Sequence, residues 1–406
     1  MKKIFVVCLL LGFVSASMAV SIGERVSVPS KILGKPHELL IYTPPSYDYS
    51  QQQRFPVLYI VDGDYNFHYL TGLIELWSNI SAFMPEMVVV GISGGDTASY
   101  RSLVKLPLNP ASGDSDAGRA GMMLDAMKAE IMPHVNAHFR TNNFNVLGGH
   151  SIGGLFVTYA AIHQPALFDR FIALSPSLWW QGGIMKDHVA GYLKDNPEVK
   201  SQLYITLANE QGMGVHGFIE MLQAQRRGDF KYQFKQFPDE THGSVGLASY
   251  QWAMFDIFKA SRLSERYFES PAAVSDYAKS LTQAYGRVMP IPSGFLRNSC
   301  YAWCGDAKMR VEIDAALAAD FPSDVAFFRV LVAEHLIGKA DLKSAEKWLN
   351  QAQESSPDYV ALHHTWYKLH KQTGDKKKAQ KAKDKLTALL AKQNIRQWQR
   401  NELMAD

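Results

Sequence analysis

Residues 148–154 read Gly-Gly-His-Ser-Ile-Gly-Gly, a G-x-S-x-G motif centred on Ser151. An apolar run precedes the motif, and a helix-like run over residues 152–161 follows it. A chain that leaves a buried strand and bends sharply into a helix exposes the hydroxyl at the bend, and side chains at Gly149 and Gly153 would crowd that bend. A G-x-S-x-G string alone also fits a Gly-rich turn with an inert serine, so its surroundings decide between the two readings.

The surroundings indicate an α/β fold. Short β-rich runs alternate with helical runs from residue 26 to about 260, which predicts a mostly parallel sheet with helices on both faces. Eight strands suit the sheet of an α/β-hydrolase. We expect them at residues 26–33, 38–42, 56–61, 87–92, 143–148, 171–175, 203–207 and 232–237, with helices that include 117–138, 152–162 and 245–260.

The N-terminal 19 residues have the features of a secretory signal. Met-Lys-Lys is followed by an apolar stretch and then by small residues that end at Ala19. We expect a signal peptide over 1–19 and a periplasmic or secreted mature protein. An N-terminal membrane anchor is the alternative, but the apolar stretch is short for a bilayer span, and no later segment is long and apolar enough for stable insertion.

Length and charge set further bounds. The 406 residues, 47% hydrophobic and 20% charged, are enough for two domains with their own cores. Loss of Lys2 and Lys3 with the signal lowers the formal net charge from +3 to about +1. The overall charge therefore gives no reason to expect nucleic acid or anionic lipid as a partner.

A second, helical domain is expected after the sheet. The composition shifts to Ala, Leu, Lys and Gln past Ser261, and a Pro-containing break follows at 288–294. We predict an α/β-hydrolase domain over 20–262, a linker and helix over 263–293, and an all-helical domain over 294–406.

This helical part contains an internal repeat. Gly305-Asp306, Ala340-Asp341 and Gly374-Asp375 stand 35 and 34 residues apart, which indicates two or three tetratricopeptide-like repeats. A generic helical bundle is the alternative. Such repeats could bind a protein partner, although the Lys-rich segment 371–385 carries an apolar stripe and is expected to be a solvated helix face.

Two cysteines stay in the mature chain. Cys300 and Cys304 lie four residues apart, and an oxidising compartment favours a structural disulfide between them. A free thiol pair or half of a metal site are the alternatives.

Ser151 needs a base to take its proton and an acid to orient that base. In α/β-hydrolases the chain order is nucleophile, acid, histidine. His242 lies just after the last predicted strand and is our candidate base, whereas the ring of His150 should diverge from the serine and pack locally. Glu210 follows the strand 203–207 and is our candidate acid. The alternative acids are Glu220, Asp239 and Glu240.

Two backbone N–H groups are expected to stabilise an oxyanion. The N–H of Ile152 begins the helix after the motif. The second donor in this fold comes from the loop after the third strand, here residues 59–65. Gly63 would let the chain approach a substrate, and we predict the N–H of Asp64 as the donor. A plain strand-ending turn is the alternative.

These residues resemble the Putative esterase family of α/β-hydrolases, which includes ferric siderophore esterases and related carboxylesterases. The resemblance covers about residues 25–260 and rests on 57–63, 89–92, Arg101, 148–155, 175–179 and 242–244. It implies a triad of Ser151, His242 and Glu210, with Asp64 and Ile152 at the oxyanion hole. The tail looks like an extension carried by some bacterial secreted members.

The expected function is that of a serine carboxylic ester hydrolase with an acyl-enzyme on Ser151, acting on a small-molecule or siderophore-type ester. A trianionic iron complex would want several cations, and Arg101 is the one cation expected near the site, which favours a generic ester. Tyr100, Trp179 and Trp180 could line an aromatic or acyl pocket, although the two tryptophans could equally be packing residues.

No metal or other cofactor is expected, because the sequence has no H-E-x-x-H, phosphate-loop or dinucleotide motif. The alternative function is a catalytically inactive hydrolase-fold scaffold whose helical repeats bind a protein partner.

Overall fold

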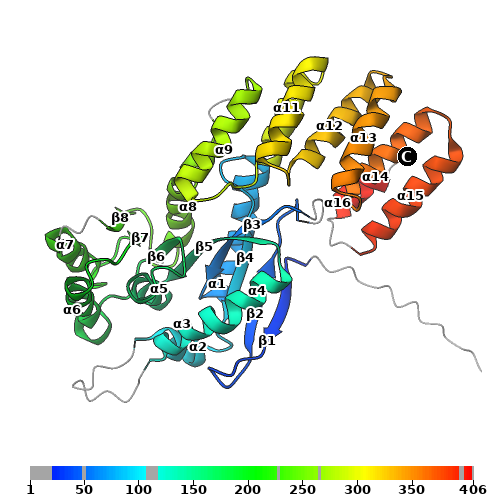
Figure 1. Cartoon of the computed structure of the whole chain (residues 1–406). Helices are drawn as coiled ribbons and strands as arrows, with labels where there is room; N and C mark the ends of the chain where they lie inside the picture. Colours follow the sequence, from blue (N-terminus) through cyan, green and yellow to red (C-terminus); the bar gives the residue numbers. More distant parts are fainter. Residues whose placement is uncertain are drawn as a thin grey trace, which may run out of the picture.

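A computed structural model describes residues 21–47, 52–106, 118–225, 229–263, 267–392 and 397–404. The expected signal peptide, residues 1–19, lies outside the described residues. Figure 1 shows a twisted sheet flanked by helices, and an array of further helices that rises from one side of it.

The sheet has eight strands in the order β1-β2-β4-β3-β5-β6-β7-β8. Strand β2 runs antiparallel to both of its neighbours, and the other neighbouring pairs are parallel. The mostly parallel α/β-hydrolase sheet is thereby confirmed. The strands are β1 (Glu24–Val28), β2 (His37–Tyr42), β3 (Phe55–Ile60), β4 (Val88–Ser93), β5 (Thr141–His150), β6 (Arg170–Leu174), β7 (Ser201–Leu207) and β8 (Phe230–Gln236).

The first strand ends earlier than predicted. It was expected over residues 26–33, but β1 ends at Val28, and Pro29 has no backbone N–H for a ladder. Glu130 then takes the following segment away from the sheet, because its carboxylate accepts hydrogen bonds from the Ser30 hydroxyl and the Lys31 and Ile32 N–H groups.

Helices cover both faces of the sheet, and side chains along each central strand point alternately to the two faces. In β3, Leu58 and Ile60 pack with α1 (Gly63–Glu75) and α8 (Val245–Ile257). Val57 and Tyr59 point to the other face. The second face is covered by α3 (Ala120–Ala126), α4 (Met132–His138), α5 (Ile152–His163), α6 (Trp180–Asp195) and α7 (Val215–Gln225).

The predicted helix 117–138 is divided. It begins at Ala120 in the described part of the chain, and a π-helical turn, Met127–Ile131, separates α3 from α4. Pro133 lies in the first turn of α4 and lacks a backbone N–H, which disturbs the hydrogen-bond ladder just before it.

The C-terminal part is helical throughout its described residues. Its helices are α9 (Pro271–Tyr285), α10 (Ser293–Trp303), α11 (Ala307–Asp320), α12 (Val325–Gly338), α13 (Leu342–Ser355), α14 (Val360–Gln372), α15 (Lys376–Leu390) and α16 (Gln397–Met404). Cys300 and Cys304 form a disulfide at the end of α10, as favoured from the sequence.

The 34- to 35-residue repeat has a local cause. Asp306, Asp341 and Asp375 are the N-caps of α11, α13 and α15, and each side chain accepts backbone N–H groups of the helix that it begins. Ala340 and Gly374 precede two of these caps with positive φ angles of 61° and 77°. The repeat thus marks helix starts, and the tetratricopeptide-like class stays a prediction.

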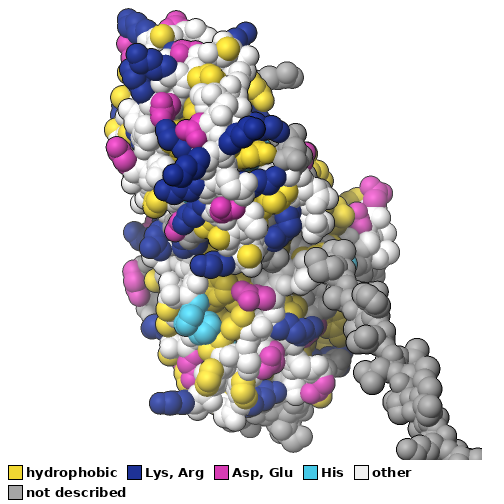
Figure 2. All heavy atoms as spheres, turned by 90° about the vertical axis from the view of Figure 1, so that its right-hand side faces the viewer, with side chains coloured by type: hydrophobic (Ala, Val, Ile, Leu, Met, Phe, Trp, Pro, Cys, Tyr) yellow, Lys and Arg dark blue, Asp and Glu magenta, His cyan; other side chains and the backbone are white. Residues whose placement is uncertain are grey.

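The lysines of α15 lie on its solvated face. Figure 2 shows Lys and Arg side chains gathered over the upper part of the molecule, on the side where α15 lies. The helix has six lysines, whereas its buried residues are Ala379, Ala382, Leu386, Leu389 and Leu390. Among the described helices, none is both long enough and apolar enough to cross a bilayer.

One hydrophobic core joins the sheet to the helical part. The Phe144 ring of β5 contacts the Tyr285 ring of α9 edge to face, with centroids 5.5 Å apart. Arg287 donates to the carbonyl of Asn142 at 2.9 Å and pairs with Asp169. The same cluster of buried side chains continues through α10 and α12 to α14. Packing is therefore continuous across the boundaries expected at 262 and 293.

Candidate active site

Ser151 lies at the sharp bend between β5 and α5. Its φ and ψ angles are 59° and −115°, a strained conformation for a residue with a side chain. Its N–H donates to the Leu174 carbonyl at 2.9 Å, which ties the bend to the end of β6. The steric prediction for the glycines is confirmed. A Cβ atom on Gly149 would lie 2.7 Å from the backbone of Gly153, and one on Gly153 would lie 2.6 Å from the Tyr100 hydroxyl.

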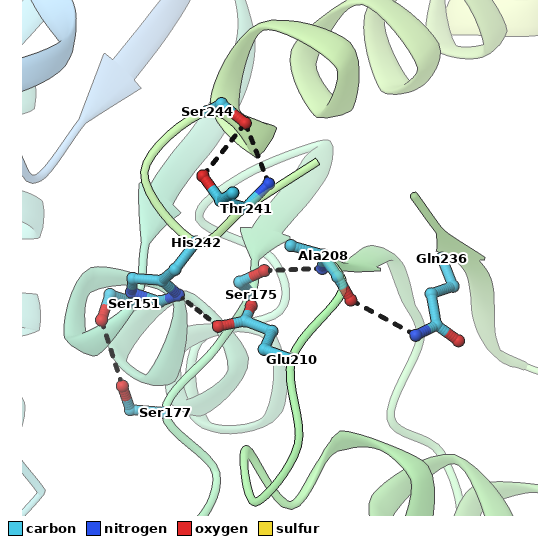
Figure 3. A network of polar contacts seen from close by, with 9 residues as sticks. All are labelled: Ser151, Ser175, Ser177, Ala208, Glu210, Gln236, Thr241, His242 and Ser244. Atoms are coloured by element: carbon cyan, nitrogen blue, oxygen red, sulfur yellow. Dashed lines mark hydrogen bonds and ion pairs between the residues drawn. The ribbon is translucent and has the colours of Figure 1, made fainter. Parts of the chain in front are cut away.

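The candidate base and acid are in contact (Figure 3). Nδ1 of His242 lies 2.7 Å from Oε2 of Glu210, although the residues are 32 positions apart. Glu210 follows β7, and His242 lies in the loop between β8 and α8. Because a carboxylate only accepts, the contact assigns a proton to Nδ1 and leaves Nε2 as an acceptor. All four candidate acids lie in the described part of the chain, and Glu210 is the one that contacts His242.

The loop that carries Glu210 is fixed at Ala208. The Ala208 N–H donates to Oγ of Ser175 at 3.1 Å, and Nε2 of Gln236 donates to its carbonyl at 3.3 Å (Figure 3). Ser175 itself has a positive φ of 37° at the end of β6. The ends of three neighbouring strands thus hold the acid in place. Ser175 was identifiable only as part of the family motif at 175–179, and no pattern in the sequence indicated Gln236.

The loop that carries His242 has its own clamp. Oγ of Ser244 accepts from the Thr241 N–H at 2.9 Å (Figure 3). The same hydroxyl donates to the carboxylate of Glu240. Glu240, one of the alternative acids, is therefore engaged with Ser244. Asp239 is exposed, and Glu220 lies on α7.

The Ser151 hydroxyl has a second serine beside it. Its Oγ lies 3.2 Å from Oγ of Ser177, and the Ser177 N–H donates to the Ser151 carbonyl at 3.0 Å (Figure 3). Ser177 is buried, and sequence reasoning missed it. The His242 ring reaches the same bend, because its centroid lies 4.4 Å from that of His150, the residue before Ser151.

The predicted oxyanion donors both lie in first helical turns. Ile152 begins α5 and Asp64 lies in the first turn of α1, where backbone N–H groups have no partner inside the helix. The Asp64 carboxylate accepts from the Ser93 hydroxyl at 2.8 Å and the Gly94 N–H at 2.9 Å, which fixes the loop after β3 against the end of β4.

The role expected for Gly63 is corrected. A Cβ atom on Gly63 would lie 2.7 Å from the backbone of Gly91, so the glycine is required by the contact between this loop and β4. Close approach to a substrate is not needed to explain it.

The predicted specificity residues lie in different surroundings. Tyr100 and Arg101 are on α2 (Thr97–Val104), where the Tyr100 hydroxyl is buried next to Gly153 and Arg101 is exposed. Trp179 is 48% exposed, and its ring meets that of Trp180 edge to face at 6.0 Å. Tyr100, Trp179 and Trp180 are the residues predicted as possible pocket walls, and that role stays a prediction; the Tyr100 hydroxyl lies next to Gly153, just after the bend at Ser151.

Residues 30–212 match the model of the Putative esterase family. The matched segment lies within the α/β part of the chain. One related protein is the siderophore triacetylfusarinine C esterase of Aspergillus fumigatus. It is 31% identical to this chain over 157 residues, which are 36% of this chain. That match spans 53% of the relative, so the chain covers about half of its length.

Two solved structures show how far the fold extends. The IroE-like serine hydrolase of Shewanella oneidensis has 23% identity and a TM-score of 0.61, with 72% of this chain and 97% of that chain covered. An uncharacterised protein of Capnocytophaga ochracea has 13% identity and a TM-score of 0.53, with 91% and 99% covered. At these identities the likeness concerns the fold alone. Because the second match covers 91% of this chain, the likeness of fold extends beyond the sheet into the helical part.

Proposed function

We propose that this protein is a serine carboxylic ester hydrolase that works through an acyl-enzyme on Ser151. The observation that carries the proposal is the hydrogen bond between His242 and Glu210 beside the strained bend at Ser151. An inactive scaffold would not require a half-buried carboxylate aligned on an imidazole at this point, and the match of residues 30–212 to the Putative esterase family also supports hydrolysis.

In the acylation step the hydrogen bond between the Ser151 and Ser177 hydroxyls breaks, and Oγ of Ser151 attacks the ester carbonyl. At the same time Nε2 of His242 takes the proton of the Ser151 hydroxyl. Glu210 stabilises the resulting imidazolium. The N–H groups of Ile152 and Asp64 stabilise the tetrahedral oxyanion. Its collapse breaks the bond to the alcohol, which leaves with the proton from His242, and the acyl group stays on Ser151.

In the second step water attacks the acyl-serine. His242 takes a proton from the water and returns it to Oγ of Ser151, so that the acid is released and the enzyme is restored. The balance is one ester and one water in, one acid and one alcohol out. No step uses a metal or other cofactor.

The substrate class proposed is a small-molecule ester, and a siderophore-type ester is its more specific form. The siderophore-type ester is proposed because of the name of the relative from Aspergillus fumigatus. The exposed Arg101 would supply one cation for such an anionic substrate. We also propose a periplasmic or secreted location, which rests on the signal-like residues 1–19.

Hydrolysis of p-nitrophenyl acetate by residues 20–406 tests the proposal. We expect Ser151→Ala to lose hydrolysis, and a fluorophosphonate probe to label Ser151 in the unaltered protein. Ser280→Ala on α9 is the matched control and should behave as wild type. Equal hydrolysis by wild type and Ser151→Ala would remove the proposal.

A further inference from the structure

A buried acid, Asp62, and a half-buried histidine, His150, lie at the bend that carries Ser151 and connect the three loops of the proposed reaction. We propose that Asp62 and His150 are positioning residues of this reaction: together they fix the oxyanion donors relative to each other and hold the ring of His242 at the nucleophile. The inference rests on the proposed function.

Asp62 joins two loops that are 88 residues apart in sequence. Its Oδ2 accepts a hydrogen bond from the His150 N–H at 2.6 Å, and its side chain is buried. Asp62 stands two residues before Asp64, and His150 stands two residues before Ile152. One short hydrogen bond therefore sets the separation of the two N–H groups proposed to bind the oxyanion, and a carboxylate is a strong acceptor for this purpose.

His150 extends the connection to the base. Its ring lies against the His242 ring, with centroids 4.4 Å apart and planes tilted by 37°. His150 was expected to pack locally, and its packing partner is the ring of His242. In the proposed reaction His150 therefore supports the loop that carries the base.

The charge state of His150 suits this role. Burial, and then the neighbouring charge of His242, lower the pKa of His150 to about 4, although the charge of Glu210 acts in the opposite direction. At neutral pH the ring is therefore uncharged. It can contact His242 without opposing the imidazolium that forms there during attack.

Core packing alone is a poor explanation for Asp62. Burial raises the pKa of its carboxyl to about 6, and Oδ1 has no hydrogen-bond partner among the described residues. The hydroxyls of Tyr69, Tyr100 and Tyr250 are also buried without a hydrogen-bond partner among the described residues. A charge on Asp62 would raise the pKa of each of them. An apolar residue would avoid these desolvation costs, so the carboxyl has a use that depends on its oxygen.

The expected effect is on turnover. Donors to the oxyanion and a correctly placed base act on the transition state, so that their displacement lowers kcat and leaves KM almost unchanged. We expect Asp62→Ala and His150→Ala to lower kcat about 100-fold, the size of effect seen when one oxyanion donor is lost.

Conservative variants and matched controls separate this role from a general loss of packing. Asp62→Asn keeps an oxygen for the His150 N–H, and His150→Phe keeps a ring against His242, so both should stay within about tenfold of wild type. Asp324→Ala removes an equally buried acid, and His364→Ala a buried histidine, in the helical part far along the chain. Both controls should keep the wild-type kcat.

The test is kcat and KM for p-nitrophenyl acetate in the full mature protein, with folding checked by circular dichroism and thermal unfolding. If Asp62→Ala does not fold, His150→Ala with His150→Phe decides. An unchanged kcat in the folded variants, a loss confined to KM, or equal losses in the controls overturns the inference while Ser151-dependent hydrolysis by wild type keeps the proposed function. Absence of that hydrolysis in wild type overturns both.

Discussion

Oε2 of Glu210 lies 2.7 Å from Nδ1 of His242, and the backbone beside Glu210 is fixed by the ends of two neighbouring strands. This contact sets which nitrogen of the imidazole is left to accept a proton from Ser151. In the proposed reaction the acid orients the base, so its removal should affect the rate of hydrolysis far more than the stability of the fold.

Glu210→Gln should lower kcat about 10³- to 10⁴-fold, because an amide can donate to Nδ1 and favour the wrong tautomer of His242. Steady-state hydrolysis of p-nitrophenyl acetate measures the loss. Asp239→Asn is the matched control, since Asp239 is an exposed acid near the same loop. Equal rates in Glu210→Gln and wild type would transfer the role to another acid.

Gly153→Ala should destabilise the protein by about 1–3 kcal/mol, because its Cβ would meet the Tyr100 hydroxyl at 2.6 Å and the Val61 side chain at 3.1 Å. Tyr100→Phe in the same chain should recover part of this loss. Gly191→Ala on α6 has open space around it and should leave stability unchanged or raise it. Urea unfolding compares the variants, and a Gly153→Ala protein as stable as Gly191→Ala would contradict the steric account.

Asp324→Asn should alter how stability depends on pH. Burial raises the pKa of Asp324 to about 7, while hydrogen bonds such as that from Ser323 act against the shift. The folded state thus holds a proton that the unfolded chain loses near pH 4, so this group stabilises the fold below that pH and its contribution is lost as the pH rises through about 7.

The asparagine variant still accepts from Gln53 but does not titrate. Relative to wild type, its free energy of unfolding should rise by about 1–3 kcal/mol between pH 5 and pH 8. Urea unfolding at the two pH values measures this difference. Parallel changes in the two proteins would show that Asp324 is already ionised in the fold at pH 5.

The Cys300–Cys304 disulfide should be intact in protein isolated without reductant. Mass spectrometry should give a mass lower by two hydrogen atoms than the dithiol form, with no alkylation until reductant is added. Because the bridge closes a very short loop, the Cys300→Ala, Cys304→Ala double variant should lose only about 2 kcal/mol. Immediate alkylation of both cysteines would contradict the bridge.

The sheet and the contact between His242 and Glu210 could be predicted from the sequence, because each has a local signal in the sequence. A parallel strand buried on both faces is a continuous apolar run, as in Phe55–Ile60, and the order of nucleophile, acid and histidine along the chain follows from the fold. Given that order, the strand ends carrying Ser151, Glu210 and His242 had to meet at one edge of the sheet.

Contacts between distant loops had no such sign. The hydrogen bond from His150 to Asp62 and the position of Ser177 beside Ser151 depend on how neighbouring loops pack, which no periodicity encodes. The errors have the same origin. The first strand was predicted to extend to residue 33, but β1 ends at Val28. Glu130, about 100 residues later in the sequence, binds the segment that follows β1.

Because the hydrophobic core is continuous between β5 and the helices from α9 onward, the helical part cannot be removed without exposing buried side chains. A cut at residue 290 would remove Phe295 of α10 from the ring of Phe268, which lies just before α9, and Phe321, which follows α11, from the ring of Tyr277 in α9. The helical part therefore contributes to the stability of the sheet and is not an independent domain. A loss of activity in a shortened protein would reflect a loss of folding before it reflected a loss of catalysis.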